Sequence, residues 1–289
     1  MKDIAYLRPQ ILQEASDYLL AYPDAKLLAG GTDLILSLER KKVTPTHIVD
    51  LSGISHLNQV VFENGILRLG AMVTIQELHE IPIVRDKFPD IAVAAGHLGC
   101  WQVRNRATLG GNLANAAPSA EMAPPLIAHN AKVKLVSSQG ERMLPLEEFF
   151  TGPGRTIMHQ GEVLAEIIVP EPREGLEMRY SRHALRRSMD ISVVNVVVHL
   201  QLKGEIVIDV KIVLGAVAPT PIRSKRAEEI LVGKKLDNIL ISNAAQAASL
   251  ECQPITDVRA TAGYRRKMVQ VLTERALYSF FKGGAALES

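Results

Sequence analysis

Two glycine pairs restrict the fold of this chain more than any other feature. The first lies in Ala29-Gly30-Gly31-Thr32-Asp33-Leu34, after a short apolar stretch, and the second in Thr108-Leu109-Gly110-Gly111-Asn112. Because glycine lets the backbone approach a ligand closely with its N–H groups turned outward, two such loops could hold a dinucleotide pyrophosphate from two sides. A lone glycine pair is more often only a tight turn. Neither loop has the Gly-x-Gly-x-x-Gly pattern, so a Rossmann fold is not indicated.

Composition excludes several classes of protein. The 289 residues, 47% hydrophobic and 22% charged, are typical of a globular protein, and the net charge of +2 gives no electrostatic basis for a nucleic-acid or membrane partner. The two cysteines, Cys100 and Cys252, are too few for a four-thiolate iron–sulfur cluster and do not suggest a disulfide framework. No segment has the pattern of a signal peptide or a membrane span, so the predicted location is the cytoplasm.

Hydrophobic periodicity and turn residues predict an α+β protein of two domains. The first domain covers residues 1–173, in the parts 1–55 and 56–173, and the second covers residues 174–289. The boundary is placed in the Pro-Glu-Pro-Arg-Glu-Gly run at 170–175, because proline and glycine interrupt both helices and strands.

Each predicted part has its own order of elements. The first part has a strand, a helix, a strand, the first glycine loop, a helix and a strand, which is the outline of a nucleotide-binding unit. The second part contains two hairpins, several short helices and a closing strand. The C-terminal domain is predicted to contain a three-stranded antiparallel sheet, with strands near 178–183, 192–202 and 205–217, followed by three helices.

The segment after the second glycine pair carries further chemistry. From Thr108 to Glu121 nearly every residue is small or polar, so we expect the segment to line a ligand or pack as a loop, neither filling a core nor forming a stable exposed helix. Asn112, Asn115 and Ser119 offer hydrogen-bonding groups, and Glu121 could accept bonds from ribityl or ribose hydroxyls. The sequence shows no hydrolase or P-loop pattern and no metal-ligand spacing, so no catalytic residue and no metal site are assigned.

The two loops, in this order, resemble those of the FAD-binding medium subunits of molybdenum hydroxylases. The resemblance covers nearly the whole chain and includes residues 26–34, 102–112, 149–154, 190–192 and 264–265. Within this family, which includes the carbon monoxide dehydrogenase medium chains, residues 182–192 and 218–223 are most similar to bacterial xanthine dehydrogenase FAD subunits.

The resemblance implies a two-part FAD-binding domain of the vanillyl-alcohol-oxidase/PCMH type, followed by the C-terminal α+β domain. Residues 29–34 and 108–112 would hold the pyrophosphate, and the residues from Asn115 to Glu121 would follow the ribityl and diphosphate region. The positions implied to contact FAD are Ala29, Gly30, Gly31, Thr32, Asp33, Leu34, Leu98, Thr108, Gly110, Gly111, Asn112, Asn115, Ser119, Glu121, Leu164, Arg182 and Asp190.

Individual roles follow from the same resemblance. Leu164 and Arg182 match flavin- or adenine-contacting positions, and Asp190 with its preceding loop would lie near the isoalloxazine. Three departures affect the details: Glu121 stands where the family usually has aspartate, Cys100-Trp101 replaces a more usual pair of small residues, and Leu98 stands where some relatives have an aromatic residue near the adenine.

The implied function is an electron relay. A molybdopterin cofactor on a large partner would hydroxylate the substrate, two [2Fe–2S] clusters on a small partner would carry the electrons, and FAD on this chain would pass them to NAD⁺ or another acceptor. The implied assembly is a dimer of heterotrimers. Two alternatives remain open: a self-sufficient flavoenzyme acting directly on a small molecule, and a scaffold that has lost FAD. The substrate also remains open among purines, carbon monoxide, heteroaromatics and aldehydes.

Overall fold

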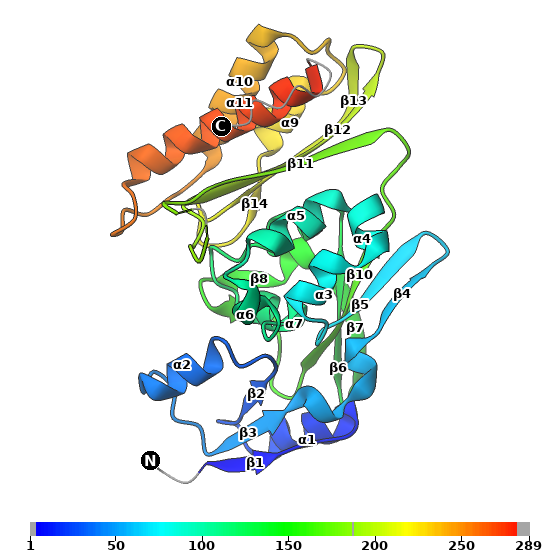
Figure 1. The fold of residues 1–289 in the computed structure, drawn as a ribbon, viewed down its shortest axis with the longest axis vertical. Coiled ribbons are helices and arrows are strands. Elements are labelled where there is room, and N and C mark those ends of the chain that lie inside the picture. Colours follow the sequence, from blue (N-terminus) through cyan, green and yellow to red (C-terminus); the bar gives the residue numbers. More distant parts are fainter. Residues whose placement is uncertain (1–3, 187, 282–289) are drawn as a thin grey trace.

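The computed structural model describes residues 4–186 and 188–281. The molecule is elongated, and Figure 1 shows three successive units along its long axis, with the N-terminal residues at one end and the C-terminal helices at the other. No helix within the described residues combines the length and apolar character needed to cross a bilayer.

The N-terminal unit is a small parallel sheet with two helices. It contains β1 (Ala5–Leu7), α1 (Leu12–Ala21), β2 (Lys26–Leu28), α2 (Leu34–Glu39) and β3 (His47–Asp50). The strand order β1-β3-β2 puts β3 in the centre, and both of its neighbours pair with it in parallel. The predicted order of strands and helices is confirmed, and the first glycine loop connects β2 to α2.

The middle unit is built on a five-stranded antiparallel sheet in the order β4-β5-β10-β6-β7. Its strands are β4 (Val60–Glu63), β5 (Ile66–Gly70), β6 (Lys132–Ser137), β7 (Gly140–Pro145) and β10 (Val163–Pro170). The two predicted hairpins are β4–β5 and β6–β7, and the closing strand β10 pairs with one strand of each.

Short helices pack on this sheet and form the largest hydrophobic core. The remaining elements are η1 (Leu51–Gly53), η2 (Ser55–Asn58), α3 (Ile75–Glu80), α4 (Pro82–Lys87), α5 (Pro89–His97), α6 (Trp101–Arg104), α7 (Leu109–Ala114), α8 (Ala123–Ala128), η3 (Leu146–Glu148), β8 (Phe150–Gly152) and β9 (Arg155–Thr156). At the start of α3, Thr74 and Glu77 form a capping box, in which each side chain accepts a hydrogen bond from the backbone of the other.

The C-terminal unit contains a four-stranded antiparallel sheet in chain order, so the prediction of three strands is wrong. The strands are β11 (Leu176–His183), β12 (Val194–Lys203), β13 (Ile206–Gly215) and β14 (Ile222–Arg223). Strand β14 pairs with the end of β13. Its two residues are too few to show the alternation by which a strand is recognised in a sequence.

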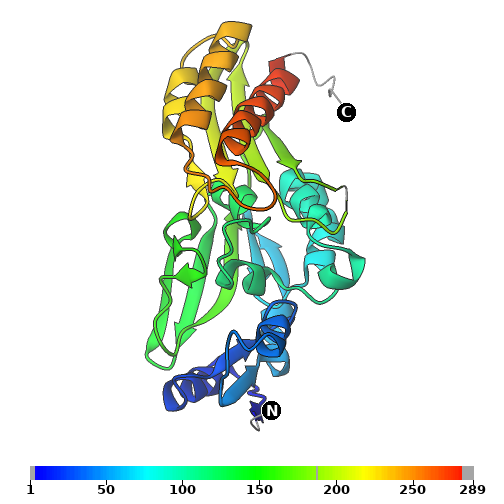
Figure 2. The ribbon, with the colours of Figure 1, turned by 90° about the vertical axis from the view of Figure 1, so that its left-hand side faces the viewer.

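The sheet of the C-terminal unit lies between two layers (Figure 2). On one side it packs against α9 (Lys225–Leu231), α10 (Asn238–Glu251) and α11 (Ala262–Phe281). On the other side it contacts α5 and α8 of the middle unit. Alternate residues of β12 therefore have different partners: Val196 and Val198 belong to the helical core, whereas Val197 belongs to the core of the middle unit.

Candidate cofactor site

The two glycine loops come from different units and contact each other. A Cβ atom on Gly30 would lie 1.9 Å from the carbonyl oxygen of Arg106 and 3.0 Å from Cα of Ala107. A Cβ atom on Gly111 would lie 3.8 Å from Cβ of Ala29. Glycine is therefore required at Gly30 because the backbone of the second loop lies directly against it.

The first loop turns sharply between β2 and α2. Gly31 has φ of +79°, a left-handed conformation that glycine adopts without strain. Within the described residues, no hydrogen bond uses the backbone N–H groups of Gly30, Gly31 or Thr32. These three donors are thus available to an anionic group, as the sequence predicts for a phosphate-binding loop.

The second loop has a different construction. Thr108 is the N-cap of α7, and its hydroxyl accepts the N–H of Gly111 at 3.1 Å. The N–H of Gly110 donates to the carbonyl of Ala71 at 2.8 Å, and a Cβ atom on Gly110 would lie 2.5 Å from Cβ of Ala71. Gly110 thus allows close packing on Ala71, directly after β5, and the backbone N–H groups of both glycines already donate hydrogen bonds.

Part of the segment from Thr108 to Glu121 differs from the prediction that it would not fill a core. Residues 109–114 form the helix α7, and Leu109 and Leu113 are fully buried in the middle core. The prediction that the segment fills no core is therefore wrong for these two leucines. The Thr108 cap and the burial of one apolar face stabilise a helix that the small residues alone would not form.

A cavity of about 570 Å³ lies between the two loops. This volume is within the range of ligand pockets, roughly 300–1,000 Å³. Of the positions implied to contact FAD, the cavity is lined by Ala29, Gly30, Gly31, Thr32, Asp33, Leu34, Leu98, Thr108, Gly110, Gly111, Asn112, Asn115 and Leu164. Other lining residues, including Ser37, Val43, Ala71, Met72 and Met158, were not predicted, since these ordinary apolar and small residues belong to no motif.

Asn112 provides a direct indication that the cavity suits a ligand with hydrogen-bond donors. Its side-chain oxygen Oδ1 is buried and has no hydrogen-bond partner within the described residues. Leaving such an oxygen unsatisfied costs about 1–3 kcal/mol. The hydroxyl groups of FAD could donate to it, and the N–H groups of Gly30, Gly31 and Thr32 could donate to its diphosphate. The residues present therefore fit this cofactor.

An Asn112→Ala chain tests this interpretation. The substitution deletes an oxygen that is unsatisfied without FAD, so we expect the free energy of unfolding without FAD to be unchanged or to rise, by up to about 3 kcal/mol, while FAD affinity falls about tenfold for one lost hydrogen bond. Urea denaturation and a fluorescence titration with FAD measure the two quantities. Asn105→Ala, an exposed truncation outside the cavity lining, is the matched control. An unchanged FAD affinity in Asn112→Ala would contradict the assignment.

Glu121 lies outside the cavity lining and holds the C-terminal sheet. Its oxygen Oε1 accepts the Ser192 hydroxyl at 2.6 Å and lies 3.6 Å from Nη1 of Arg182. Its other oxygen accepts the Tyr180 hydroxyl and, at 3.4 Å, Nδ2 of Asn195. Burial raises the pKa of Glu121 above its usual value, although these donors and the Arg182 guanidinium oppose the rise.

Arg182 joins this network to the edge of the cavity. Its guanidinium donates to the carbonyl of His97 at 2.6 Å and to the carbonyl of Asp190 at 3.2 Å. His97 directly precedes the cavity residue Leu98. The Asp190 carboxylate closes its own loop by accepting the N–H groups of Arg186 at 2.7 Å and Ile191 at 2.9 Å.

Four of the implied positions thus lie outside the cavity lining: Ser119, Glu121, Arg182 and Asp190. Glu121, Arg182 and Asp190 form the adjoining network, whereas Ser119 is half-buried. Their contact with FAD stays a prediction. Arg187, in the loop before Asp190, lies outside the described residues. Of the departures, Leu98 lines the cavity, and Trp101 is 57% exposed, so its ring does not fill a core.

Comparisons with known proteins agree with this geometry. Residues 2–172 match the FAD binding domain in molybdopterin dehydrogenase, and residues 179–280 match the CO dehydrogenase flavoprotein C-terminal domain. The chain thus contains the FAD-binding domain of an oxidoreductase. It belongs to the family of FAD-binding subunits of molybdopterin dehydrogenases.

Individual relatives match over nearly their whole length. The chain is 32% identical to a putative xanthine dehydrogenase FAD-binding subunit of Escherichia coli K12, covering 94% of each chain. It is 33% identical to the glyceraldehyde dehydrogenase medium chain of Sulfolobus acidocaldarius, covering 95% of this chain and 97% of the relative. Among solved structures, a carbon monoxide dehydrogenase from Hydrogenophaga pseudoflava superposes with a TM-score of 0.94 at 32% identity, covering 98% of both chains.

Proposed function

We propose that this chain is the FAD-binding electron-transfer subunit of a multi-subunit molybdenum hydroxylase, and that it passes electrons from [2Fe–2S] clusters on a partner through FAD to NAD⁺ or another acceptor. The cavity between the two glycine loops carries this proposal, because it combines three available backbone N–H donors with the unsatisfied oxygen of Asn112.

The chain's own residues would bind and orient the cofactor. FAD, when bound, supplies redox chemistry that protein side chains lack. Gly30, Gly31 and Thr32 would donate to the diphosphate, while Leu98 and Leu164 would provide apolar contacts. In this proposal residues 1–173 form an FAD-binding domain of the PCMH type, and residues 174–289 form a separate C-terminal domain.

The proposed complex contains a large molybdenum subunit and a small iron–sulfur subunit, arranged as a dimer of heterotrimers in the cytoplasm. The two cysteines of this chain support a separate iron–sulfur subunit, since four thiolates hold a conventional cluster. The named relatives act on different substrates, and the substrate would bind to another subunit. A carbon monoxide or heteroaromatic dehydrogenase is therefore as compatible with this chain as a xanthine dehydrogenase.

Two measurements test the proposal. We expect the purified chain to bind one equivalent of FAD with a flavin absorption spectrum, and a tagged chain to co-purify with two further chains that contain molybdenum and iron. Absence of FAD binding would favour the scaffold alternative. Turnover of a small molecule by the chain with FAD alone would favour the self-sufficient flavoenzyme.

A further inference from the structure

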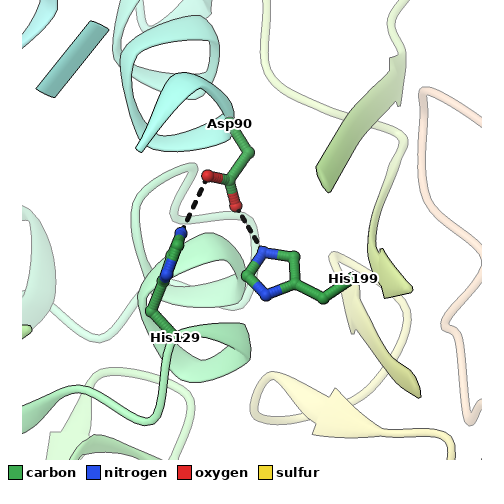
Figure 3. A group of neighbouring side chains, drawn as sticks. All are labelled: Asp90, His129 and His199. Atoms are coloured by element: carbon green, nitrogen blue, oxygen red, sulfur yellow. Dashed lines mark hydrogen bonds and ion pairs between the residues drawn. The ribbon is translucent and has the colours of Figure 1, made fainter. Parts of the chain in front are cut away.

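A buried polar cluster lies outside the cavity, where the middle and C-terminal units meet (Figure 3). Asp90 in the first turn of α5, His129 after α8 and His199 in β12 have side chains that are 0%, 1% and 2% exposed. Nε2 of His129 lies 2.8 Å from one carboxylate oxygen of Asp90, and Nε2 of His199 lies 2.8 Å from the other. The Asp90 carboxylate is thus hydrogen-bonded to one histidine of the middle unit and one of the C-terminal unit.

The geometry of this cluster is that of two hydrogen bonds. Two imidazoles and a carboxylate are also ligands for Zn²⁺, and their ligand atoms lie within 4.8 Å of one another. However, each Nε2 already lies at hydrogen-bond distance from its own oxygen. Lys211, the cross-strand neighbour of His199, adds a positive charge nearby, with its ammonium group donating to the Ala128 carbonyl at 2.9 Å. These features favour hydrogen bonds between the three side chains over a bound metal ion.

Helix α5 is held by the C-terminal sheet at both ends. At its first turn, Asp90 is bonded to His199 of β12. At its last residue, the carbonyl of His97 accepts the guanidinium of Arg182 from β11. Arg104 of α6 also donates to the carbonyls of Gly96 at 3.0 Å and Leu98 at 3.3 Å, which places a second cation at the helix C-terminus. The chain then enters the cavity wall at Leu98.

We propose that Asp90, His129 and His199 are positioning residues for the cofactor cavity: they dock α5 onto the C-terminal sheet and thereby set the position of Leu98 at the cavity wall. The inference rests on the proposed binding of FAD. None of the three side chains lines the cavity, so they act on FAD through α5.

Protonation adds a pH dependence to this docking. Burial raises the pKa of Asp90, but the charges and hydrogen bonds of His129 and His199 outweigh burial and hold that pKa well below its usual range. Burial lowers the pKa of His199 from 6.5, although Asp90 opposes the change, and His129 and Lys211 reinforce it. Asp90 and His199 thus interact with each other and with His129, and Lys211 from β13 also acts on His199.

Because the pKa of His199 is lowered in the docked state, docking becomes weaker as the pH falls. Below pH 6.5 the unfolded or undocked histidine takes up a proton that the docked ring resists. Docking is therefore fully stabilised above about pH 6.5 and weakens as the pH falls from there toward the lower pKa of the docked ring. We expect FAD affinity to fall with it.

The first experiment compares Asp90→Asn with Asp86→Asn, an exposed aspartate in α4 that undergoes the same change of charge. An asparagine can accept from one histidine but presents its NH₂ group to the other. We expect FAD to bind at least tenfold more weakly to Asp90→Asn at pH 8, and within twofold of the original in Asp86→Asn, measured by fluorescence titration.

The second experiment separates positioning from general stability through the pH profile. Glutamine in His199→Gln retains an N–H donor for Asp90 but takes up no proton. We expect FAD affinity of the original chain to fall at least threefold between pH 7.5 and pH 5.5, and the affinity of His199→Gln to fall less over the same range. This pH profile tests the positioning role of the cluster even if Asp90→Asn does not fold.

Several results would overturn the inference. A folded Asp90→Asn with unchanged FAD affinity, an unchanged pH profile in His199→Gln, or one equivalent of zinc in the purified chain would each do so. Failure of the original chain to bind FAD at any pH would instead contradict the proposed function.

Discussion

A Gly30→Ala chain is expected to lose FAD binding almost completely while the middle unit keeps its fold. The added Cβ atom would lie 1.9 Å from the carbonyl oxygen of Arg106 and 2.7 Å from its carbon. Both are backbone atoms, so no side-chain rotation relieves the clash, and the two loops must separate. The core of the middle unit contains no residue of the N-terminal unit, whereas the core under the N-terminal sheet also includes Val163 and Ala165 of β10. We therefore expect the middle unit to keep its fold and the separation to change the cavity between the two units.

The expected loss of FAD affinity is at least 100-fold, or about 2.7 kcal/mol, measured by calorimetric or fluorescence titration. Gly152→Ala is the matched control, because a Cβ atom there meets nothing within 4 Å. Far-ultraviolet circular dichroism tests whether Gly30→Ala remains folded. A folded Gly30→Ala with full FAD occupancy would show that contact between the loops does not shape the binding site.

A Glu121→Ala chain is expected to lose about 3–5 kcal/mol of stability toward denaturant. The substitution leaves the Arg182 side chain, 8% exposed, without its carboxylate partner. It also removes the acceptor for Ser192, Tyr180 and Asn195. Removing one partner of a buried ion pair is costly because the remaining charge stays desolvated.

Two companion variants sharpen this prediction. Glu141→Ala removes the carboxylate of an exposed ion pair with Lys134, 2.6 Å long, and is expected to change stability by less than about 1 kcal/mol. Glu121→Gln keeps one acceptor oxygen, and because the pKa of Glu121 is already raised, we expect it to cost less than Glu121→Ala. Equal stability of the Glu121→Ala and Glu141→Ala chains would contradict the structural role given to Glu121.

Elements that depend on short local patterns, such as helix caps and hairpin turns, were predicted correctly from the sequence. Thr74 and Glu77 have the spacing of a capping box, and both of its hydrogen bonds are present. The turn residues at 63–65 and 138–140 identified the two hairpins of the middle sheet. The fourth strand of the C-terminal sheet was missed because Ile222 and Arg223 become a strand only through pairing with β13.

The candidate site was predicted only in part, because some of its residues carry a local sequence signal and others do not. Glycine positions carry their own signal, since only glycine allows the close approach found at Gly30. By contrast, Glu121 was expected near the cofactor hydroxyls, and no local pattern indicates that Ser192 and Asn195 would donate to it across 71 and 74 residues.

The family, the cofactor class and half of the residues around the cavity were predictable from sequence, because these depend on short segments whose backbone geometry requires particular residue types. Which polar groups are buried together depends instead on how the units pack. Asp90 is separated from His129 by 39 residues and from His199 by 109, and His199 lies in a strand rich in valine. Such residues meet because α5, α8 and β12 pack into adjacent layers, and packing between layers leaves no periodic signal in any single segment.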